Sequence, residues 1–381
     1  MKIVPVASGK GGVGKSLLAA NIALALGEAG AKVVLADLDL GGSNLHLVLG
    51  LSGMPNSIGT FLSGRKSSFQ EIIYPTEYRN VSFIPGDSEI PGLANLNAPQ
   101  KSRLNKQLKQ IDADYLVLDL GAGTYNTIID FFLLSSHGLI VTSPTPTATV
   151  NAYLFLKNAA FRILNSSVKR KSPGAEYLKS LKGNSGAPGR VYLPELVDKL
   201  KEIDPESHRA FMHSYSHFRP RLVLNMLEDP KDAEKANRLR HSAQEYLNLD
   251  LLHLGVMYRD EVQDIALNSR LPVLKYKPQS LLSQAIVRIA EKLMQLSGED
   301  EEAPLDMEAV DDSYYAAESD AENDFGSKLN YVEELLNSGT LTTGDLIETI
   351  KSQQFEIVQL RKQNMLYKSK LVHAIKQGFK A

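Results

Sequence analysis

Short runs of apolar residues recur along residues 1–260, and each run ends in small or polar residues. The stretches between the runs are long enough for helices that cross from one strand to the next. Strands that are apolar along their whole length are typical of a parallel sheet buried on both faces. The runs predict strands at Ile3–Val6, Val33–Ala36, Val81–Ile84, Tyr115–Leu118, Leu139–Thr142, Leu222–Leu224 and Leu251–Met257.

Helical periodicity fills several of the intervening stretches. Ser16–Gly27 is rich in Leu and Ala and closes with the sequence Gly-Glu-Ala-Gly, which is a typical helix stop. Leu281–Leu296 repeats apolar residues at helical spacing and predicts the last helix that covers the sheet. The alternation of strands and helices predicts an α/β fold with a doubly wound, mostly parallel sheet over residues 1–298.

Two segments interrupt this pattern. Residues 165–220 form an insertion with Gly and Pro breakers around a helical stretch at Leu193–Ile203, and residues 162–190 hold seven basic side chains against one Glu. Residues 299–326 carry twelve acidic side chains and no Lys or Arg. Their high charge and low hydrophobicity predict a disordered acidic linker.

Residues 327–381 return to helical periodicity, and from Leu346 onward a heptad repeat can be written. Glu356 and Arg361 are spaced to pair between two parallel strands of a coiled coil. A single helix docked on a partner or on the body is an equal alternative. One core position of the repeat would hold Ile350, Ile357, Asn364 and Leu371, and the other Leu346, Gln353, Leu360, Tyr367 and Ala374.

Composition narrows the classes of function. The chain has 381 residues, of which 43% are hydrophobic, and it has no cysteine. Disulfides, thiolate zinc sites and iron–sulfur ligation within this chain are therefore excluded. The apolar runs are shorter than the roughly 18–20 residues that cross a bilayer, and no apolar signal core stands before the first strand, so we expect a cytoplasmic protein. The net charge of −2 combines an acidic tail with a basic body, which suits contact with nucleic acid or an anionic membrane.

The sequence SGKGGVGKS at residues 8–16 contains the phosphate-loop pattern G-x-x-x-x-G-K-[ST]. In such a loop the backbone N–H groups bind phosphate oxygens, Lys15 reaches the β- and γ-phosphates, and the Ser16 hydroxyl binds Mg²⁺. A predicted strand precedes the loop and a predicted helix follows it, as the motif requires. We therefore expect ATP and Mg²⁺ as cofactors, with nucleotide contacts from Gly9, Lys10, Gly11, Gly12, Val13, Gly14, Lys15, Ser16 and Leu17.

Lys10 is a second lysine that the phosphate-loop pattern does not need. With it, the sequence Lys-Gly-Gly-Val-Gly-Lys-Ser resembles the deviant Walker A motif of the MinD/ParA family. The resemblance implies that Lys10 reaches the phosphates bound by the other subunit of a nucleotide-sandwich homodimer that forms on ATP binding. Lys10 and Lys15 would then both act in catalysis.

Further residues match the same family in order. Residues 33–40 resemble its switch I strand, and the resemblance implies that Asp39 positions the attacking water while Asp37 lies near Mg²⁺. Residues 115–123 resemble its Walker B strand and switch II, with Asp119 near the metal and Gly121 near the γ-phosphate. Carboxylates at strand ends beside a phosphate loop suit a hydrated Mg²⁺. Asn225 falls where the family places an adenine-contacting Asn.

The resemblance covers residues 1–164 and 221–297 and is greatest to the MinD branch and to MinD-like regulators of flagellar number. It implies a dimeric ATP-hydrolysing switch in spatial regulation, acting on the division site, flagella or cargo. It also implies that hydrolysis is slow without a protein activator. The supporting stretches are Gly-Ser-Asn-Leu at 42–45, Phe-Ile-Pro-Gly-Asp at 83–87 and Asp-Leu-Gly-Ala-Gly at 119–123.

Several alternatives share the loop. Iron–sulfur carriers need cysteines that this chain lacks, and bacterial tyrosine kinases end in a tyrosine cluster that Tyr314-Tyr315 matches poorly. A scaffold that binds ATP without hydrolysing it is a further alternative. For the surface that the switch binds, Leu371, Ile375 and Phe379 lie on one helical face among lysines and predict peripheral binding to the inner face of the cell membrane. The alternative is a ParA-like partitioning ATPase that binds DNA through the basic residues 162–190.

Overall fold

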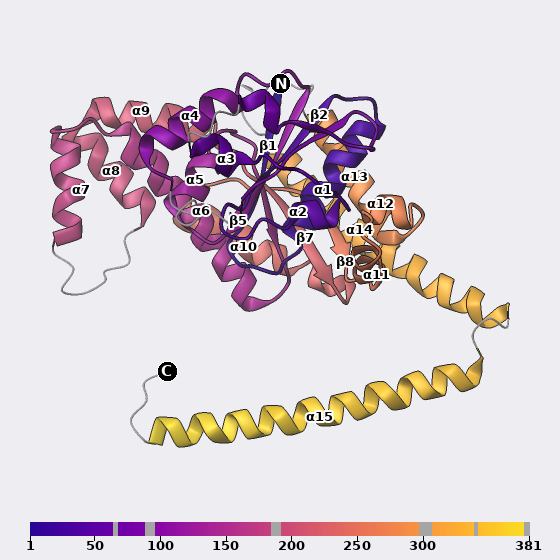
Figure 1. The fold of residues 1–381 in the computed structure, drawn as a ribbon. Coiled ribbons are helices and arrows are strands. Elements are labelled where there is room, and N and C mark those ends of the chain that lie inside the picture. The colour runs from indigo at the N-terminus through magenta and orange to yellow at the C-terminus, as the bar shows by residue number, and fades with distance from the viewer. Residues whose placement is uncertain (64–67, 88–95, 184–191, 297–306, 339–341, 377–381) are drawn as a thin grey trace. The chain divides into compact units, whose positions relative to one another are not determined.

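The computed structural model describes residues 1–63, 68–87, 96–183, 192–296, 307–338 and 342–376. The chain divides into two compact units, Met1–Glu322 and Asn323–Ala381. The first unit contains the sheet and the predicted nucleotide site (Figure 1).

An eight-stranded sheet with the order β3-β4-β2-β5-β1-β6-β7-β8 forms the centre of the first unit. All neighbouring strands are parallel except β3 and β4. Each of the strands predicted from an apolar run is present, and β3 was missed because two residues are too few to leave a pattern. The strands are β1 (Lys2–Ser8), β2 (Val33–Leu38), β3 (Tyr74–Pro75), β4 (Val81–Ile84), β5 (Tyr115–Ala122), β6 (Leu139–Thr142), β7 (Arg221–Leu227) and β8 (Leu252–Tyr258).

Helices flank this sheet and confirm the predicted doubly wound α/β fold (Figure 1). Helix α1 (Lys15–Glu28) packs on β2, β5 and α13 (Leu281–Leu296), and α13 also covers β8. Helix α5 (Asn126–Phe132) packs on β1 and β5, and α6 (Pro146–Ser167) on β6 and α10 (Lys235–Leu247). Shorter connections hold α2 (Leu45–Val48), α3 (Ile58–Leu62), α4 (Ala98–Leu108), α11 (Val262–Asn268) and α12 (Val273–Tyr276).

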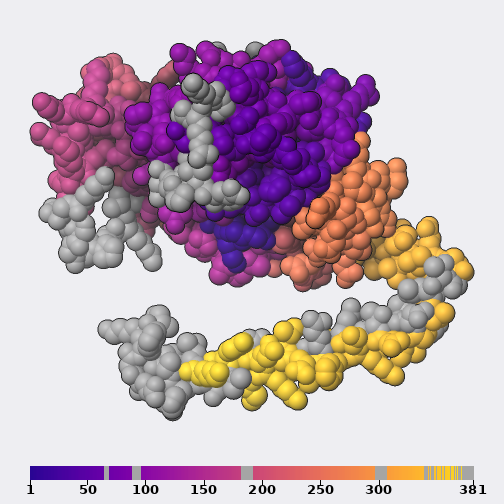
Figure 2. Space-filling model, in the orientation of Figure 1, coloured from indigo at the N-terminus to yellow at the C-terminus, as the bar shows by residue number. Residues whose placement is uncertain are grey.

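The insertion before β7 is helical. It contains α7 (Pro173–Gly183), α8 (Leu193–Ile203) and α9 (Pro205–Ser216), of which only α8 was expected from the sequence. Asp204 joins two of these helices, because its carboxylate accepts hydrogen bonds from the backbone N–H groups of Ser207 and Gly174. Figure 2 shows these helices, in pink, as a lobe at one side of the face in view.

The acidic segment is ordered where the structure describes it, so the predicted disordered linker is wrong for residues 307–326. These residues belong to helix α14 (Met307–Asn337), and the first unit extends through Glu322 rather than ending at residue 298. The high charge of this segment obscures an apolar stripe at helical spacing. Residues 299–306 lie outside the described part of the chain. The stripe consists of Val310, Tyr314, Ala317 and Ala321, all buried.

Helix α14 lies along the edge strand β8. The His253 backbone N–H donates to Ser313 Oγ at 3.1 Å, and the Tyr258 hydroxyl donates to the Ala321 carbonyl at 2.9 Å. Basic side chains of α10 and α13 pair with acidic residues of α14, in the ion pairs Arg240–Asp311 and Lys292–Asp320. The acidic helix is therefore held by apolar burial and by opposite charge, and it covers groups of an otherwise open sheet edge.

The second unit contains α15 (Thr343–Lys376), which Figure 1 shows as one continuous helix. This agrees with the helical periodicity of the tail. The side chains of Leu371 and Ile375 and the whole of Phe379, which carry the predicted membrane face, lie outside the described residues. Membrane binding by this segment stays a prediction.

Candidate nucleotide-binding site

The phosphate loop connects β1 to α1 as the motif predicts. Gly14 precedes α1 with φ of 85°, a left-handed conformation that favours glycine, and an added Cβ would lie 2.2 Å from Asn225 Nδ2. Gly9 packs against the backbone of α6, where an added Cβ would lie 2.0 Å from the Asn151 carbonyl oxygen. Glycine is therefore required at position 14 by conformation and by space, and at position 9 by space alone.

Lys15 and Asp119 form a buried ion pair at the centre of the site. Lys15 Nζ lies 2.6 Å from Asp119 Oδ1, and the two side chains are only 7% and 1% exposed. The same ammonium donates to Ser16 Oγ at 3.2 Å. Burial raises the pKa of Asp119, and the adjacent Lys15 ammonium opposes that rise. Before a phosphate can bind Lys15, the ammonium must exchange this carboxylate for the phosphate.

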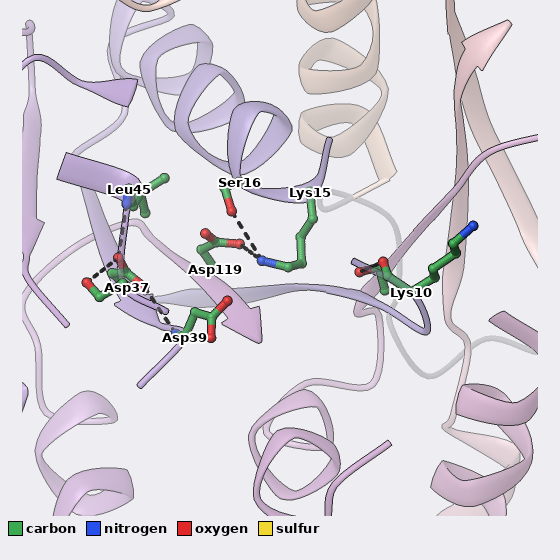
Figure 3. Close-up of polar contacts among 9 residues, drawn as sticks. Lys10, Lys15, Ser16, Asp37, Asp39, Leu45 and Asp119 are labelled. Atoms are coloured by element: carbon green, nitrogen blue, oxygen red, sulfur yellow. Dashed lines mark hydrogen bonds and ion pairs between the residues drawn. The ribbon is translucent and has the colours of Figure 1, made fainter. Parts of the chain in front are cut away.

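Asp37 lies beside Asp119, because the two residues are direct partners in the parallel register of β2 and β5. Its carboxylate accepts from the Ser43 hydroxyl at 2.7 Å and from the backbone N–H groups of Leu45 and Asp39, both at 3.1 Å (Figure 3). Burial, followed by the charge of Asp119, raises the pKa of Asp37 to about 6 against these hydrogen bonds. A nearby cation would stabilise the ionised form of this buried carboxylate.

The donor set fits Mg²⁺. Ser16 offers a hydroxyl, and Asp37 and Asp119 offer carboxylates from adjacent strand ends. Hard oxygen donors of this kind are what Mg²⁺ prefers, with water and phosphate completing its shell. Among the described residues, no group of three or more acidic, His or Cys side chains is placed to hold a metal ion.

Asp39 and Gly121 come together from the ends of β2 and β5. An added Cβ on Gly121 would lie 3.0 Å from Asp39 Oδ1, so the predicted switch I and switch II residues are neighbours. Asp39 is only partly buried, and Figure 3 shows it beside Asp37.

Lys10 occupies a different position from the other charged residues. Figure 3 shows its side chain directed away from Lys15, Asp119 and Asp37. Its Nζ is exposed and donates to Thr147 Oγ1 at 2.9 Å, at the start of α6. A hydroxyl orients this ammonium but does not neutralise its charge.

Asn225 contacts the phosphate loop itself. It is 2% exposed, and its Nδ2 donates to the Val13 carbonyl at 2.9 Å while its Oδ1 accepts from the Met226 N–H. Asn225 thus holds the loop in place. A contact between Asn225 and an adenine stays a prediction.

Sequence reasoning missed three residues that organise the site. Ser43 anchors Asp37, Thr147 orients Lys10, and buried Asn21 of α1 accepts from the Leu274 N–H to hold α12. Ser43 stood in a stretch already matched to the family. Thr147 could have been found from the sheet order, because β6 pairs with β1 and parallel strands end at the same edge. Asn21 could not be identified from the sequence, because it lies in a helix that is otherwise rich in apolar residues.

Known proteins resemble this chain in sequence. Residues 1–164 match the ParA family model, described as NUBPL iron-transfer P-loop NTPase. The flagellum site-determining protein YlxH of Helicobacter pylori is 33% identical over 48% of this chain. The antiactivator FleN of Pseudomonas aeruginosa is 30% identical over 41% of this chain. The chain spans 63% and 56% of the lengths of these two relatives.

Solved structures show the same fold. The septum site-determining protein MinD from Pyrococcus horikoshii, complexed with Mg-ADP, aligns with 78% of this chain and 97% of its own, with a TM-score of 0.53 and 23% identity. A chain of the MinC:MinD cell division protein complex from Aquifex aeolicus aligns with 80% of this chain and 99% of its own, with a TM-score of 0.50 and 19% identity. In the described part of the chain, no helix has the length and apolarity to span a bilayer. Residues 1–164 therefore match a ParA-family P-loop NTPase domain, and MinD, FleN and YlxH proteins are among the relatives of this chain.

Proposed function

We propose that this protein binds and hydrolyses ATP as a dimeric switch, with Lys10 of each subunit contacting the nucleotide of the other. The observation that carries the proposal is the position of Lys10. Its ammonium is exposed, points away from its own phosphate-binding cluster and has a hydroxyl as its described partner. A phosphate presented by a second subunit would give this charge an anion.

Each site residue would have a distinct task. The loop N–H groups and Lys15 bind the phosphates, and Asp39 orients the attacking water. Ser16, Asp37 and Asp119 would hold Mg²⁺, which when bound neutralises phosphate charge. Asp37 must be ionised to do so, which its pKa of about 6 allows at neutral pH.

The process that the switch serves is proposed from its relatives. YlxH and MinD are named for determining flagellar and septal sites, and FleN is named as an antiactivator. We therefore place this protein in the spatial regulation of flagella, the division site or another cargo, with a protein partner that accelerates hydrolysis. A cytoplasmic location, with peripheral attachment to the membrane, belongs to the same proposal.

The test is the molar mass, with and without ATP and Mg²⁺, of an Asp39→Ala variant that also carries Ile357→Lys/Leu360→Lys on α15, measured by light scattering after size-exclusion chromatography. The two α15 substitutions replace exposed apolar side chains, so that association through this helix does not mask association driven by ATP. Blocking hydrolysis should hold the ATP state, so ATP should increase association. Adding Lys10→Ala should abolish that increase, whereas Lys179→Ala, an exposed lysine on α7, should not. Association that does not depend on ATP, or that persists after Lys10→Ala, would overturn the proposed switch.

DNA binding is the second candidate, because Arg170, Lys171 and Lys179 are exposed on the insertion. Other basic residues of the stretch are already paired, Arg162 with Asp130 and Lys169 with Glu206. These ion pairs reduce the positive field that DNA would meet. If DNA is nevertheless the surface, ATP-dependent affinity for random duplex should fall steeply with salt and should fall further in a Lys171→Gln/Lys179→Gln variant.

A further inference from the structure

Helix α15 presents a long apolar surface in the second unit. The helix has 34 residues, which corresponds to about 51 Å at 1.5 Å per residue. Four described side chains at heptad core positions are largely exposed: Ile350 is 55%, Ile357 40%, Leu360 51% and Tyr367 63% exposed. Exposure of large apolar side chains to water is unfavourable, and at these spacings another helix can cover them and remove that free-energy cost.

We propose that α15 pairs with α15 of a second copy of this chain as a parallel, in-register coiled coil that forms without nucleotide. The register explains the polar positions as well as the apolar ones. Asn364 falls at the same core position as Ile350 and Ile357, where an Asn is satisfied by its twin only in a parallel pair in register.

Charge favours the same arrangement. Glu356 precedes a core position and Arg361 follows the next one, so in a parallel pair each Glu356 is placed opposite Arg361 of the other strand. The other positions of this kind between residues 349 and 368 hold Thr, Gln or a single Lys, so no like-charged pair opposes the parallel register. An antiparallel pair would lose the Glu–Arg match.

The length of α15 also favours packing against a partner helix. In proteins most of the stability of a helix comes from tertiary packing rather than from propensity, and α15 holds β-branched and aromatic residues that lower helix propensity. A second copy supplies the packing along the whole seam. Two ATPase domains joined in this way would meet at an effective concentration on the order of mM for short flexible connections. The sandwich dimer of the proposed function would then form within one tethered pair, and this consequence rests on that function.

The absence of cysteine allows a direct test of the register. In the full chain, Ile350→Cys introduces the one thiol at a core position, and Phe355→Cys introduces it on the opposite side of the helix, where Phe355 is 68% exposed. Without nucleotide and under mild oxidation, Ile350→Cys should form a disulfide-linked dimer and Phe355→Cys should not. A disulfide requires Cα atoms within about 7 Å, which symmetric core positions meet only in a parallel pair in register. Equal cross-linking of the two variants, or none, would overturn the proposal.

Molar mass separates this contact from the nucleotide switch. Nucleotide-free wild type should be a dimer, and so should Phe355→Lys, while Ile357→Lys/Leu360→Lys should lose half the mass and keep its ADP binding. Lys10→Ala should leave this nucleotide-free dimer intact, so failure of the switch would not affect the result. A nucleotide-free monomer at every concentration that the protein tolerates would refute the coiled coil, as would a core variant that stays dimeric. A core variant that loses only binding to anionic vesicles would show that a membrane covers this face instead.

Discussion

The buried pair of Lys15 and Asp119 allows a prediction about the protein without nucleotide. Asp119→Asn removes the carboxylate and leaves the Lys15 ammonium 7% exposed, with Ser16 Oγ as its described remaining partner. Removing one member of a buried ion pair costs about 3–5 kcal/mol because the other charge stays buried. We expect a loss at the lower end, about 3 kcal/mol, since Ser16 keeps part of the solvation. Urea denaturation without nucleotide or metal measures this loss.

The double variant Lys15→Met/Asp119→Asn is the matched control. It removes both charges and should recover most of the loss, with a coupling energy of about 2 kcal/mol. ADP in the presence of a chelator should stabilise Asp119→Asn more than wild type, because its phosphates supply the missing anion and no ion pair has to break. The reasoning fails if Asp119→Asn costs less than about 1 kcal/mol, or if ADP stabilises both proteins equally.

Three further predictions concern separate parts of the first unit. The folded-state pKa of Asp37 is raised to about 6, so the wild type binds more protons when it is folded than when it is unfolded. Its free energy of unfolding without metal should therefore fall by about 1 kcal/mol between pH 5 and 7. Asp37→Asn should remove this pH dependence in denaturation curves. Gly9→Ala would force a Cβ against the α6 backbone and should lower the free energy of unfolding by about 1–3 kcal/mol or lower ADP affinity at least tenfold. Gly11→Ala, whose added Cβ has its nearest neighbour 3.9 Å away, should change the free energy of unfolding by no more than about 0.5 kcal/mol. Tyr314→Ala should speed proteolysis of α14 without weakening ADP binding, and Tyr315→Ala, at a 71% exposed position, should behave as wild type.

The sheet and the phosphate loop could be predicted because local patterns encode them. Fully buried strands appear as apolar runs, and the turn from β1 to α1 needs glycines at fixed spacing. The neighbourhood of Asp37 and Asp119 also followed, since parallel strand ends meet at one edge. The ion pair between Lys15 and Asp119 could not be predicted, because it joins residues 104 positions apart and depends on the register of β1, β2 and β5.

The acidic segment shows why charge alone misleads. Its composition is that of a disordered linker, because it combines high charge with low hydrophobicity. In the structure Asp311 and Asp320 meet Arg240 and Lys292, which come from α10 and α13 and are remote in sequence. Composition gives no information about a complementary surface elsewhere in the chain. The buried stripe that includes Tyr314 was the one local signal, and it repeats at 3.6-residue spacing among the acids.

The two lysines of the loop differ in how their charge is balanced before nucleotide arrives. Lys15 is buried and has Asp119, so its charge is compensated within the subunit. Lys10 is exposed and has Thr147, which offers a lone pair but no charge, so water and salt still screen it. Moving Lys15 onto a phosphate exchanges one anion for another, whereas moving Lys10 onto one adds an ion pair where none existed. In the proposed switch, the free energy that couples ATP to self-association should therefore come mainly from Lys10, and the dependence of that association on salt should disappear with Lys10→Ala.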